Sequence, residues 1–187
     1  RDTFAASTYN FTNEHGQTGN LTLQKPIESV NYPVKSYDEL PELDLGLTTD
    51  FNFLAVAQYG PRKNLKNTIK WFMEEFKNES VGLVLKTSLM KNCYMDRLQL
   101  YNEMRTFIAS FSREHTCKVY LLHGDMTDAE MHALYAHKDI SALLTLTHGE
   151  GFGLPIFEAA YSGVPVIAPG WSGQLDFLCV DGEDRFY

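Results

Sequence analysis

Apolar and polar positions along this chain fall into blocks that predict strands and helices in turn. Five continuous apolar runs are typical of strands buried on both faces: 51–57, 81–86, 117–122, about 141–147 and 164–168. Between these runs apolar side chains recur at helical spacing, as at Leu65, Ile69 and Phe72. Short connections join each strand to the next helix. The pattern therefore predicts an α/β fold, a doubly wound, Rossmann-like parallel sheet with helices on both faces.

Start and stop signals mark the ends of several predicted helices. Thr127 and Glu130 have the spacing of a capping box. Pro155 stands where a proline is favoured as the first helical residue, and Gly163 is a typical helix stop. Upstream, the apolar spacing predicts a helix over about 63–78.

The first fifty residues interrupt this alternation. They are rich in Thr, Asn, Gly and acidic side chains, and short apolar pieces such as Leu21-Thr22-Leu23 sustain no period. We therefore predict a connector over residues 1–50 and a Rossmann-like domain over residues 51–187. Because the chain opens on Arg1 and stops soon after the fifth strand, we expect it to be cut short at both ends.

Composition and charge exclude several classes of protein. No apolar run approaches the roughly 20 residues that cross a bilayer, so we expect no membrane span. The formal net charge of −8 argues against a nucleic-acid-binding protein. Cys93, Cys117 and Cys179 fit no metal-ligand spacing and indicate free thiols in a reducing compartment. We predict a cytoplasmic protein with no metal site.

The most informative segment is HGEGFGLPIFE, residues 148–158, which follows the fourth strand. Backbone amides around Gly151, Phe152 and Gly153 can form a concave anion site, since glycine adopts positive φ without strain. The helix expected to begin at Pro155 would point its positive end at the same place. The segment predicts a site for a phosphorylated ligand.

Two carboxylates flank this turn, and each has a structural and a functional interpretation. Glu158 would lie on the first helical turn, where the helix dipole alone favours a carboxylate by about 0.3–1 kcal/mol. Alternatively, its two oxygens accept hydrogen bonds from the vicinal hydroxyls of a ribose. Glu150 lies at the strand end and cannot be such a cap, so its spacing favours a role toward a ligand. We assign His148 no catalytic role.

A pyrophosphate at this place requires a cation at a neighbouring strand end. Arg62-Lys63-Asn64 follows the first strand and opens a helix, so Lys63 is the first candidate and Arg62 the second. A solvated basic pair is the structural alternative. Neither a Walker pattern nor GxGxxG follows the first strand, which argues against a nucleoside triphosphatase or a nicotinamide dehydrogenase.

These pieces resemble a known family. The segment from Glu150 to Glu158, continued by AAYSGVPVIA to residue 168, resembles the signature of the fourth-family retaining GT-B glycosyltransferases, the glycosyl transferases group 1. The Arg62-Lys63-Asn64 segment and the stretch Val119–Tyr135 fall where that family has them, and the resemblance covers about 51–182. It implies the C-terminal, donor-binding half of a GT-B fold. Residues 1–50 would then end a missing N-terminal domain that binds the acceptor.

The resemblance also implies an activity and roles for the site residues. A hexose would pass from a nucleotide-diphosphate sugar, the co-substrate, to an unknown glycan, lipid or protein acceptor, with retention and with no cofactor or metal. Glu150 would contact the donor sugar as the catalytic residue. Amides from Gly151 to Leu154 would hold the sugar and the diphosphate. Glu158 would bind the ribose, and Lys63 would neutralise the leaving diphosphate.

Alternatives stay open at this level. Many family members place an arginine five positions before the lysine, where this chain has Gln58, so Arg62 is the candidate to replace it. The missing domain also suits a non-catalytic nucleotide-sugar-binding module, and a GT-B nucleotide-sugar epimerase is a third hypothesis. We expect a glycosyltransferase fragment of glycan biosynthesis that is inactive without its N-terminal domain. Parts that this chain lacks would decide whether it works at the membrane surface.

Overall fold

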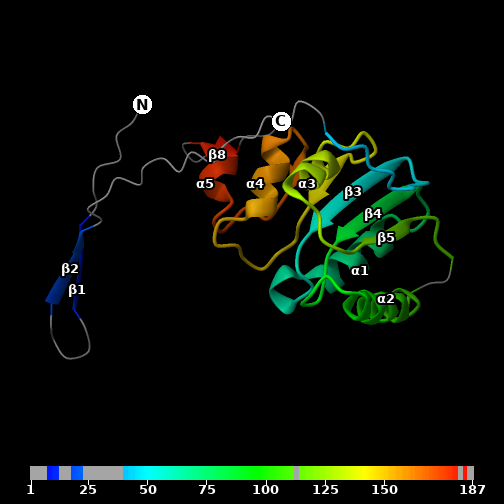
Figure 1. Ribbon diagram of the computed structural model, residues 1–187, viewed down its shortest axis with the longest axis horizontal. Helices are drawn as coiled ribbons and strands as arrows, with labels where there is room; N and C mark the ends of the chain where they lie inside the picture. Colours follow the sequence, from blue (N-terminus) through cyan, green and yellow to red (C-terminus); the bar gives the residue numbers. More distant parts are fainter. Residues whose placement is uncertain (1–7, 13–17, 23–39, 112–113, 181–182, 185–187) are drawn as a thin grey trace. The chain divides into compact units, whose positions relative to one another are not determined.

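The computed structural model describes five stretches of the chain: residues 8–12, 18–22, 40–111, 114–180 and 183–184. The chain divides into two compact units, Arg1–Asp38 and Glu39–Tyr187. Within the first unit, strands β1 (Thr8–Thr12) and β2 (Thr18–Thr22) pair in antiparallel fashion (Figure 1). The interpretation of residues 1–50 as a connector stays a prediction.

The second unit is built on a five-stranded sheet in which every neighbouring pair is parallel. Its strands are β3 (Phe51–Val56), β4 (Val81–Lys86), β5 (Lys118–Leu122), β6 (Ala142–Leu144) and β7 (Val166–Ile167). Their order is β5-β4-β3-β6-β7. The chain therefore moves outward from β3 to one edge, then returns to the other side of β3. The predicted parallel sheet is confirmed.

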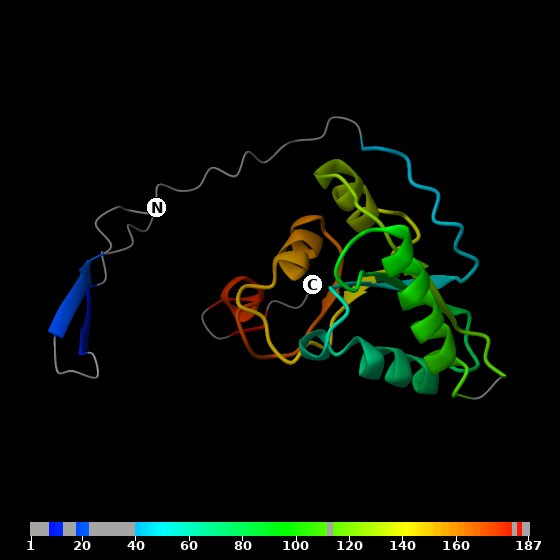
Figure 2. The same cartoon turned by 60° about the horizontal axis from the view of Figure 1, so that its bottom comes forward.

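Helices cover both faces of this sheet (Figure 2). The helices are α1 (Leu65–Glu75), α2 (Tyr94–Ile108), α3 (Asp128–Tyr135), α4 (Leu154–Tyr161) and α5 (Leu175–Leu178). Helices α1 and α2 lie on one face, and α3 and α4 lie on the other. A short antiparallel pair, β8 (Cys179–Val180) with β9 (Glu183–Asp184), follows α5. No helix in the described stretches has the length and apolar character needed to cross a membrane.

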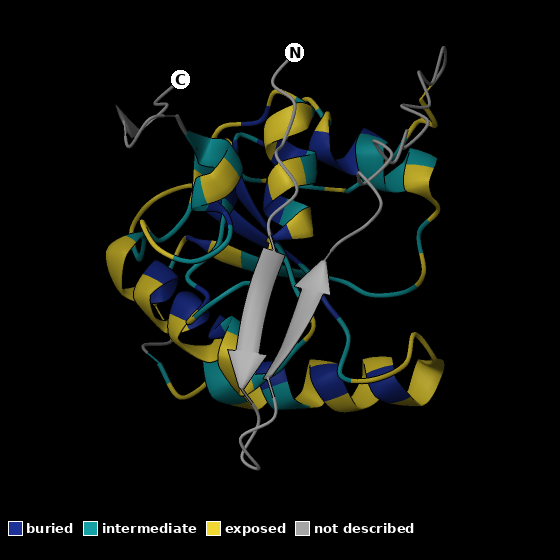
Figure 3. Ribbon diagram, turned by 90° about the vertical axis from the view of Figure 1, so that its left-hand side faces the viewer, coloured by how far each residue is buried: buried dark blue, intermediate teal, exposed yellow. Residues whose placement is uncertain are grey.

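Successive residues of the central strand belong to different cores. Phe53 and Ala55 pack in one buried cluster with residues of α1, whereas Leu54 packs in a second cluster with Leu134 of α3 and Ile156 of α4. This alternation follows from the period of two along a strand. Figure 3 shows the buried residues gathered where the helices meet the sheet. A doubly wound domain needs strands that are apolar on both faces, as the continuous apolar runs predicted.

The helix predicted over 63–78 is interrupted near its start. Residues Pro61–Lys63 form a 3-10 turn, and α1 begins only at Leu65 because Asn64 adopts the left-handed conformation with φ 57°. The Asn64 side chain donates from Nδ2 to the carbonyl of Leu146 at 2.9 Å, which fixes this bend against the loop after β6. The interruption leaves Lys63 in the 3-10 turn, outside α1.

The other predicted helix boundaries are confirmed, and the start of α4 is displaced by one residue. Thr127 and Glu130 form a complete capping box at the start of α3, as predicted. Helix α4 begins one residue before Pro155, with Gly153 as its N-cap at φ 90°. Gly163 follows the end of α4 at φ 78°, a conformation that favours glycine and ends the helix.

Burial of both sheet faces has a measurable consequence. Leu54 and Leu85 are 0% exposed and face opposite cores. We expect Leu54→Ala and Leu85→Ala each to lower the free energy of unfolding by about 2–5 kcal/mol in chemical denaturation. Leu98→Ala serves as the matched control because Leu98 is 41% exposed on α2. A small effect at either buried leucine would contradict a sheet covered on both faces.

Candidate functional site

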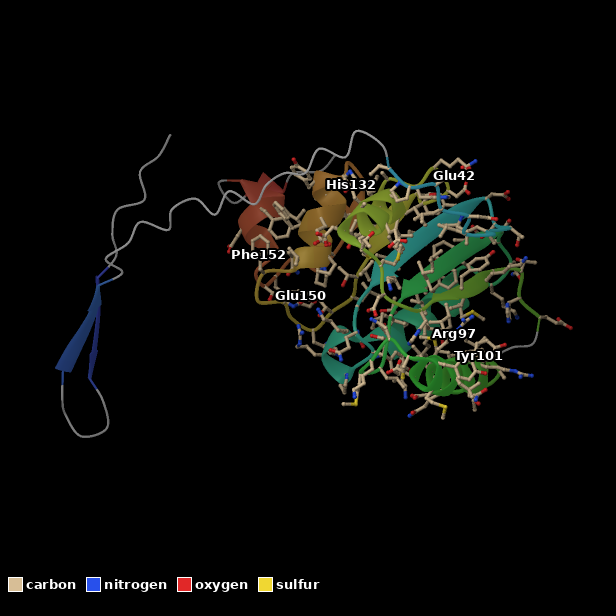
Figure 4. The ribbon with its side chains drawn as sticks, in the orientation of Figure 1. Glu42, Arg97, Tyr101, His132, Glu150 and Phe152 are labelled. Carbon is tan, nitrogen blue, oxygen red and sulfur yellow. The ribbon has the colours of Figure 1, made fainter. Side chains whose placement is uncertain are left out.

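The strand order reverses between β3 and β6, and this is where open parallel sheets bind ligands. The carboxyl ends of the two strands lie side by side because β3 and β6 pair directly, Phe53 with Ala142 and Leu54 with Leu143. The segment after β3 carries Lys63. The loop after β6 carries Glu150, which Figure 4 labels. Two segments far apart in sequence thus meet at the carboxyl edge of the sheet.

An ion pair joins the two loops. Lys63 Nζ lies 2.5 Å from Glu150 Oε1, and an Arg62 guanidinium nitrogen lies 3.1 Å from Glu150 Oε2. The side chains of Lys63 and Glu150 are 16% and 9% exposed, whereas that of Arg62 is 61% exposed. Solvent screens the arginine more strongly, so Lys63 is the principal counterion of Glu150.

The charge state of Glu150 follows from these contacts. Burial by itself would raise the pKa of Glu150, but hydrogen bonds from Lys63 and Arg62 hold it below its ordinary value. A hydrogen bond from Thr147 acts in the same direction. Glu150 is therefore an ionised acceptor at neutral pH, and two cations stand beside it.

The backbone around Glu150 is held from the far side by the turn after β7. Ser172 Oγ accepts the amide N–H of Glu150 at 2.8 Å and donates to its carbonyl at 2.6 Å. Gly173 packs closely against the loop of Glu150, since a Cβ on Gly173 would stand 1.9 Å from the carbonyl oxygen of Gly151. Only glycine fits at 173, and the loop cannot shift without moving the turn.

Four consecutive amides in this loop are free to bind a ligand. Within the described residues, the N–H groups of Gly151, Phe152, Gly153 and Leu154 have no hydrogen-bond acceptor. Gly153, at φ 90°, turns the chain into α4, so the amides lie at the helix N-terminus. Unpaired N–H groups and the helix dipole together favour an anion here.

Glu158 is the second predicted carboxylate, and it lies on α4 facing α3. Its Oε2 accepts a hydrogen bond from the hydroxyl of Tyr135 at 3.0 Å. Burial raises the pKa of Glu158, the Tyr135 hydrogen bond opposes that rise, and the charge of Asp128 adds to it. Glu150 pairs with Arg62 and Lys63, whereas Glu158 bonds to Tyr135, so the two carboxylates form separate parts of the candidate site.

The side chain of Phe152 lies in an aromatic cluster and not beside Glu150. Its ring centroid is 5.0 Å from that of Phe177 and 5.5 Å from that of Phe157. Figure 4 shows Phe152 and Glu150 at different places in the same loop. The amide of Phe152, and not its ring, is the group that a phosphate can reach in this conformation.

Among the described residues, the side chains of Gln58 and His148 make no contact with the ion pair. Gln58 donates from Nε2 to the carbonyl of Leu89 in the loop after β4. Its side chain is therefore engaged there and does not join Lys63 and Arg62. His148 is exposed, and its backbone amide donates to the carbonyl of Arg62 at 2.9 Å. Arg62 is thus the cation that accompanies Lys63.

The loop after β5, residues 123–126, is tied to the end of β4. Lys86 donates to the carbonyl of Gly124, and His123 Nε2 lies 2.8 Å from Asp96 Oδ1. Asp96 also accepts the amides of Leu89, Met90 and Lys91 at 2.8–3.0 Å. Burial would raise the pKa of Asp96, yet these hydrogen bonds hold it far below its ordinary value. Asp96 thus links the loops that follow β4 and β5.

Sequence reasoning missed the residues that support the site. Thr147, Ser172, Tyr135 and Asp96 act through contacts to residues that are mostly distant in the chain. Ser172 belongs to the segment GWSG, residues 170–173. Its two glycines are typical of a turn and are the one local signal for this position. Across the described residues, no three His, Cys, Asp or Glu side chains are grouped as metal ligands.

Comparison with solved structures shows the fold. An Escherichia coli structure described as trehalose-6-phosphate bound with UDP-2-fluoro glucose has a TM-score of 0.53 at 15% identity and covers 71% of this chain and 32% of its own. The Anabaena protein Alr3699/HepE, in complex with UDP and glucose, gives 0.53 at 18%, covering 71% and 33%. The α,α-trehalose 6-phosphate synthase of Burkholderia multivorans gives 0.54 at 17%, covering 72% and 31%.

The chain therefore spans about a third of the length of the structures that it matches. No curated protein sequence matches it significantly. The family model of glycosyl transferases group 1, in contrast, matches residues 44–186, which include the loops of Lys63 and Glu150 and all of α4. The sheet order, the paired loops and this match agree, and the chain belongs to the glycosyl transferases group 1 family.

Proposed function

We propose that this chain is the donor-binding domain of a retaining glycosyltransferase, which transfers a hexose from a nucleotide-diphosphate sugar to an acceptor. The observation that carries the proposal is the meeting of a cation and four free amides at the strand-order reversal. Lys63 and the amides from Gly151 to Leu154 supply positive charge and N–H donors for a diphosphate. Membership of the glycosyl transferases group 1 family supports this function.

In this proposal Glu150 contacts the donor sugar. Its carboxylate is ionised and paired with Lys63, and Ser172 holds its backbone, so the carboxylate can accept hydrogen bonds from sugar hydroxyls at a fixed position. The diphosphate leaves beside Lys63 and Arg62, whose charges stabilise the negative charge that develops on it. Glu158 accepts the ribose hydroxyls. The charge is supplied by side chains, so the proposal requires no metal and no cofactor.

Acceptor binding and catalysis are proposed for a longer protein. We propose that a second domain faces the candidate site and binds the acceptor, and that the 187-residue chain alone holds the donor without transferring it. The cytoplasmic location stays a prediction. Transfer by the isolated chain would contradict the requirement for a second domain. A free sugar of altered configuration, with no glycoside, would favour an epimerase.

The first test is a thermal-shift screen with the diphosphates of uridine, guanosine and adenosine and their common sugars. A ligand at about a hundred times its Kd stabilises the folded chain by about 2.7 kcal/mol, which gives a clear shift. The screen is run in EDTA and repeated with Mg²⁺, and we expect the same shift in both because no metal takes part. If no nucleotide stabilises the chain under either condition, the proposed function is wrong.

The role of Lys63 is tested by Lys63→Ala. We expect the affinity for the nucleotide-diphosphate sugar to fall by about tenfold to a hundredfold, since a hydrogen bond to a charged group contributes about 1.5–3 kcal/mol. Isothermal titration calorimetry measures the loss. Lys66→Ala is the matched control because Lys66 lies on α1 and pairs with Glu103 at 2.7 Å. Equal losses in both variants would show a general effect of net charge.

The role of Glu150 is tested by comparing two ligands with Glu150→Gln. The neutral side chain frees Lys63 and Arg62 from their counterion, so we expect the nucleoside diphosphate without a sugar to bind as tightly as before or more tightly. The nucleotide sugar should lose affinity relative to it, because the carboxylate acceptor is gone. Calorimetry with both ligands gives the ratio of the affinity for the nucleotide sugar to the affinity for the nucleoside diphosphate. An unchanged ratio would remove Glu150 from the sugar site.

A further inference from the structure

The hydroxyl of Tyr135 is the partner that α3 provides to the candidate site. Tyr135 is the last residue of α3 and is 1% exposed, within the core cluster that also contains Ile156 and Ala159 of α4. Its hydroxyl donates to Glu158 Oε2 at 3.0 Å. Among the described residues this is the only hydrogen bond of the Glu158 side chain. One oxygen of the carboxylate is engaged, and Oε1 keeps its capacity to accept.

The phenol is the donor in its hydrogen bond with Glu158. Burial raises the pKa of Tyr135 far above its ordinary value, and the negative charge of Glu158 raises it further. The hydroxyl therefore stays protonated and donates its one hydrogen to Glu158. Because the ring is enclosed by the core, the position of the hydroxyl is fixed more firmly than that of the half-buried glutamate. A fixed donor selects one rotamer of the longer side chain.

We infer that Tyr135 is a positioning residue for nucleotide recognition, holding Glu158 by one oxygen so that the other accepts the ribose hydroxyls of the bound nucleotide. The inference rests on the proposed function of Glu158 and adds the residue that orients it. The carboxylate must present a free oxygen in a defined direction, since a misdirected acceptor loses the hydrogen bond. Tyr135 makes no contact with the nucleotide in this arrangement and acts through Glu158.

If the hydrogen bond between Tyr135 and Glu158 served only to hold α3 against α4, its loss would affect ligand binding in a different way. Loss of such a bond would lower stability and weaken every ligand by a similar factor. Loss of a positioning contact weakens only ligands that carry the ribose hydroxyl, and has no further effect once Glu158 is removed. The two roles are therefore separable by ligand and by double-mutant cycle.

The experiment compares Tyr135→Phe, Glu158→Ala and the double variant in calorimetric titrations. The probes are the uridine, guanosine and adenosine diphosphates and their 2′-deoxy forms. We expect Tyr135→Phe to weaken the ribonucleotide by about three- to tenfold and the 2′-deoxynucleotide by less, as one net hydrogen bond would. In the Glu158→Ala background, the same substitution should change neither affinity. Tyr161→Phe is the matched control because Tyr161 is 60% exposed on α4.

The pH dependence of ribonucleotide binding gives a second readout. The titratable groups on the helices around Glu158 are Asp128, Glu130, His132 and Tyr135 of α3, Tyr161 of α4 and Asp176 of α5. Of these, Tyr135 lowers and Asp128 raises the pKa of Glu158. Without the phenol, Glu158 takes up its proton at a higher pH. The affinity of Tyr135→Phe should therefore fall at a higher pH than that of the unaltered protein when the solution is acidified.

The outcomes separate this inference from the function on which it rests. If the unaltered protein binds none of the three diphosphates, both are wrong. If it binds one and Tyr135→Phe leaves the ratio of ribo- to 2′-deoxynucleotide affinity unchanged, the inference alone is overturned. Should Tyr135→Phe fail to fold, the double variant leaves no unpaired partner and is compared with Glu158→Ala. Weaker binding by the double variant would show that Tyr135 acts independently of Glu158.

Discussion

Strand β3 pairs with β4 on one side and with β6 on the other, and the position of every candidate functional group depends on this reversal of strand order. The chain moves away from β3 through β4 and β5 and then crosses back. The loops that follow β3 and β6 are consequently neighbours, although Lys63 and Glu150 lie far apart in sequence. A different strand order would keep every helix and strand and still separate the lysine from the glutamate.

The ion pair of Lys63 and Glu150 gives the candidate site its electrostatic character. Holding two charges in a partly buried place costs desolvation energy, which their attraction offsets only when the geometry is close. Free backbone amides beside the pair add positive potential without adding net charge. A chain with a formal charge of −8 can in this way keep a local site for an anion. Donor binding in the proposed function exchanges one set of counterions for another.

The second carboxylate depends on a different set of contacts. Glu158 is held by Tyr135 across the interface of α3 and α4, on the face of the sheet opposite α1. Ser172 and Gly173 hold the loop of Glu150 from the turn after β7. The two ends of the proposed nucleotide-sugar site are thus braced by separate elements. This arrangement lets substitutions at Lys63 and Tyr135 act on different parts of one ligand.

The sequence by itself determined the elements and the chemistry of the candidate residues. Apolar runs with a continuous pattern predicted strands buried on both faces, Thr127 and Glu130 predicted a capping box, and Gly163 predicted a helix end. Signals of this kind depend on interactions between residues close in sequence. They therefore predict the same helices and strands whatever the order of the strands in the sheet. The glycine-rich turn at residues 151–153 and the Arg62-Lys63 segment likewise predicted a site for a phosphorylated ligand.

The tertiary structure decided which of these residues meet. It bent the chain at Asn64, directed Gln58 toward the loop after β4, and gave Glu158 its partner on α3. It also placed Arg62, and not Gln58, beside Lys63 at the carboxylate of Glu150. Such contacts depend on packing between segments that are 20 to 90 residues apart, as with the separation of 23 for Tyr135 and Glu158 and of 87 for Lys63 and Glu150. No local pattern encodes that packing, because many sequences with the same periodicity can place their loops differently.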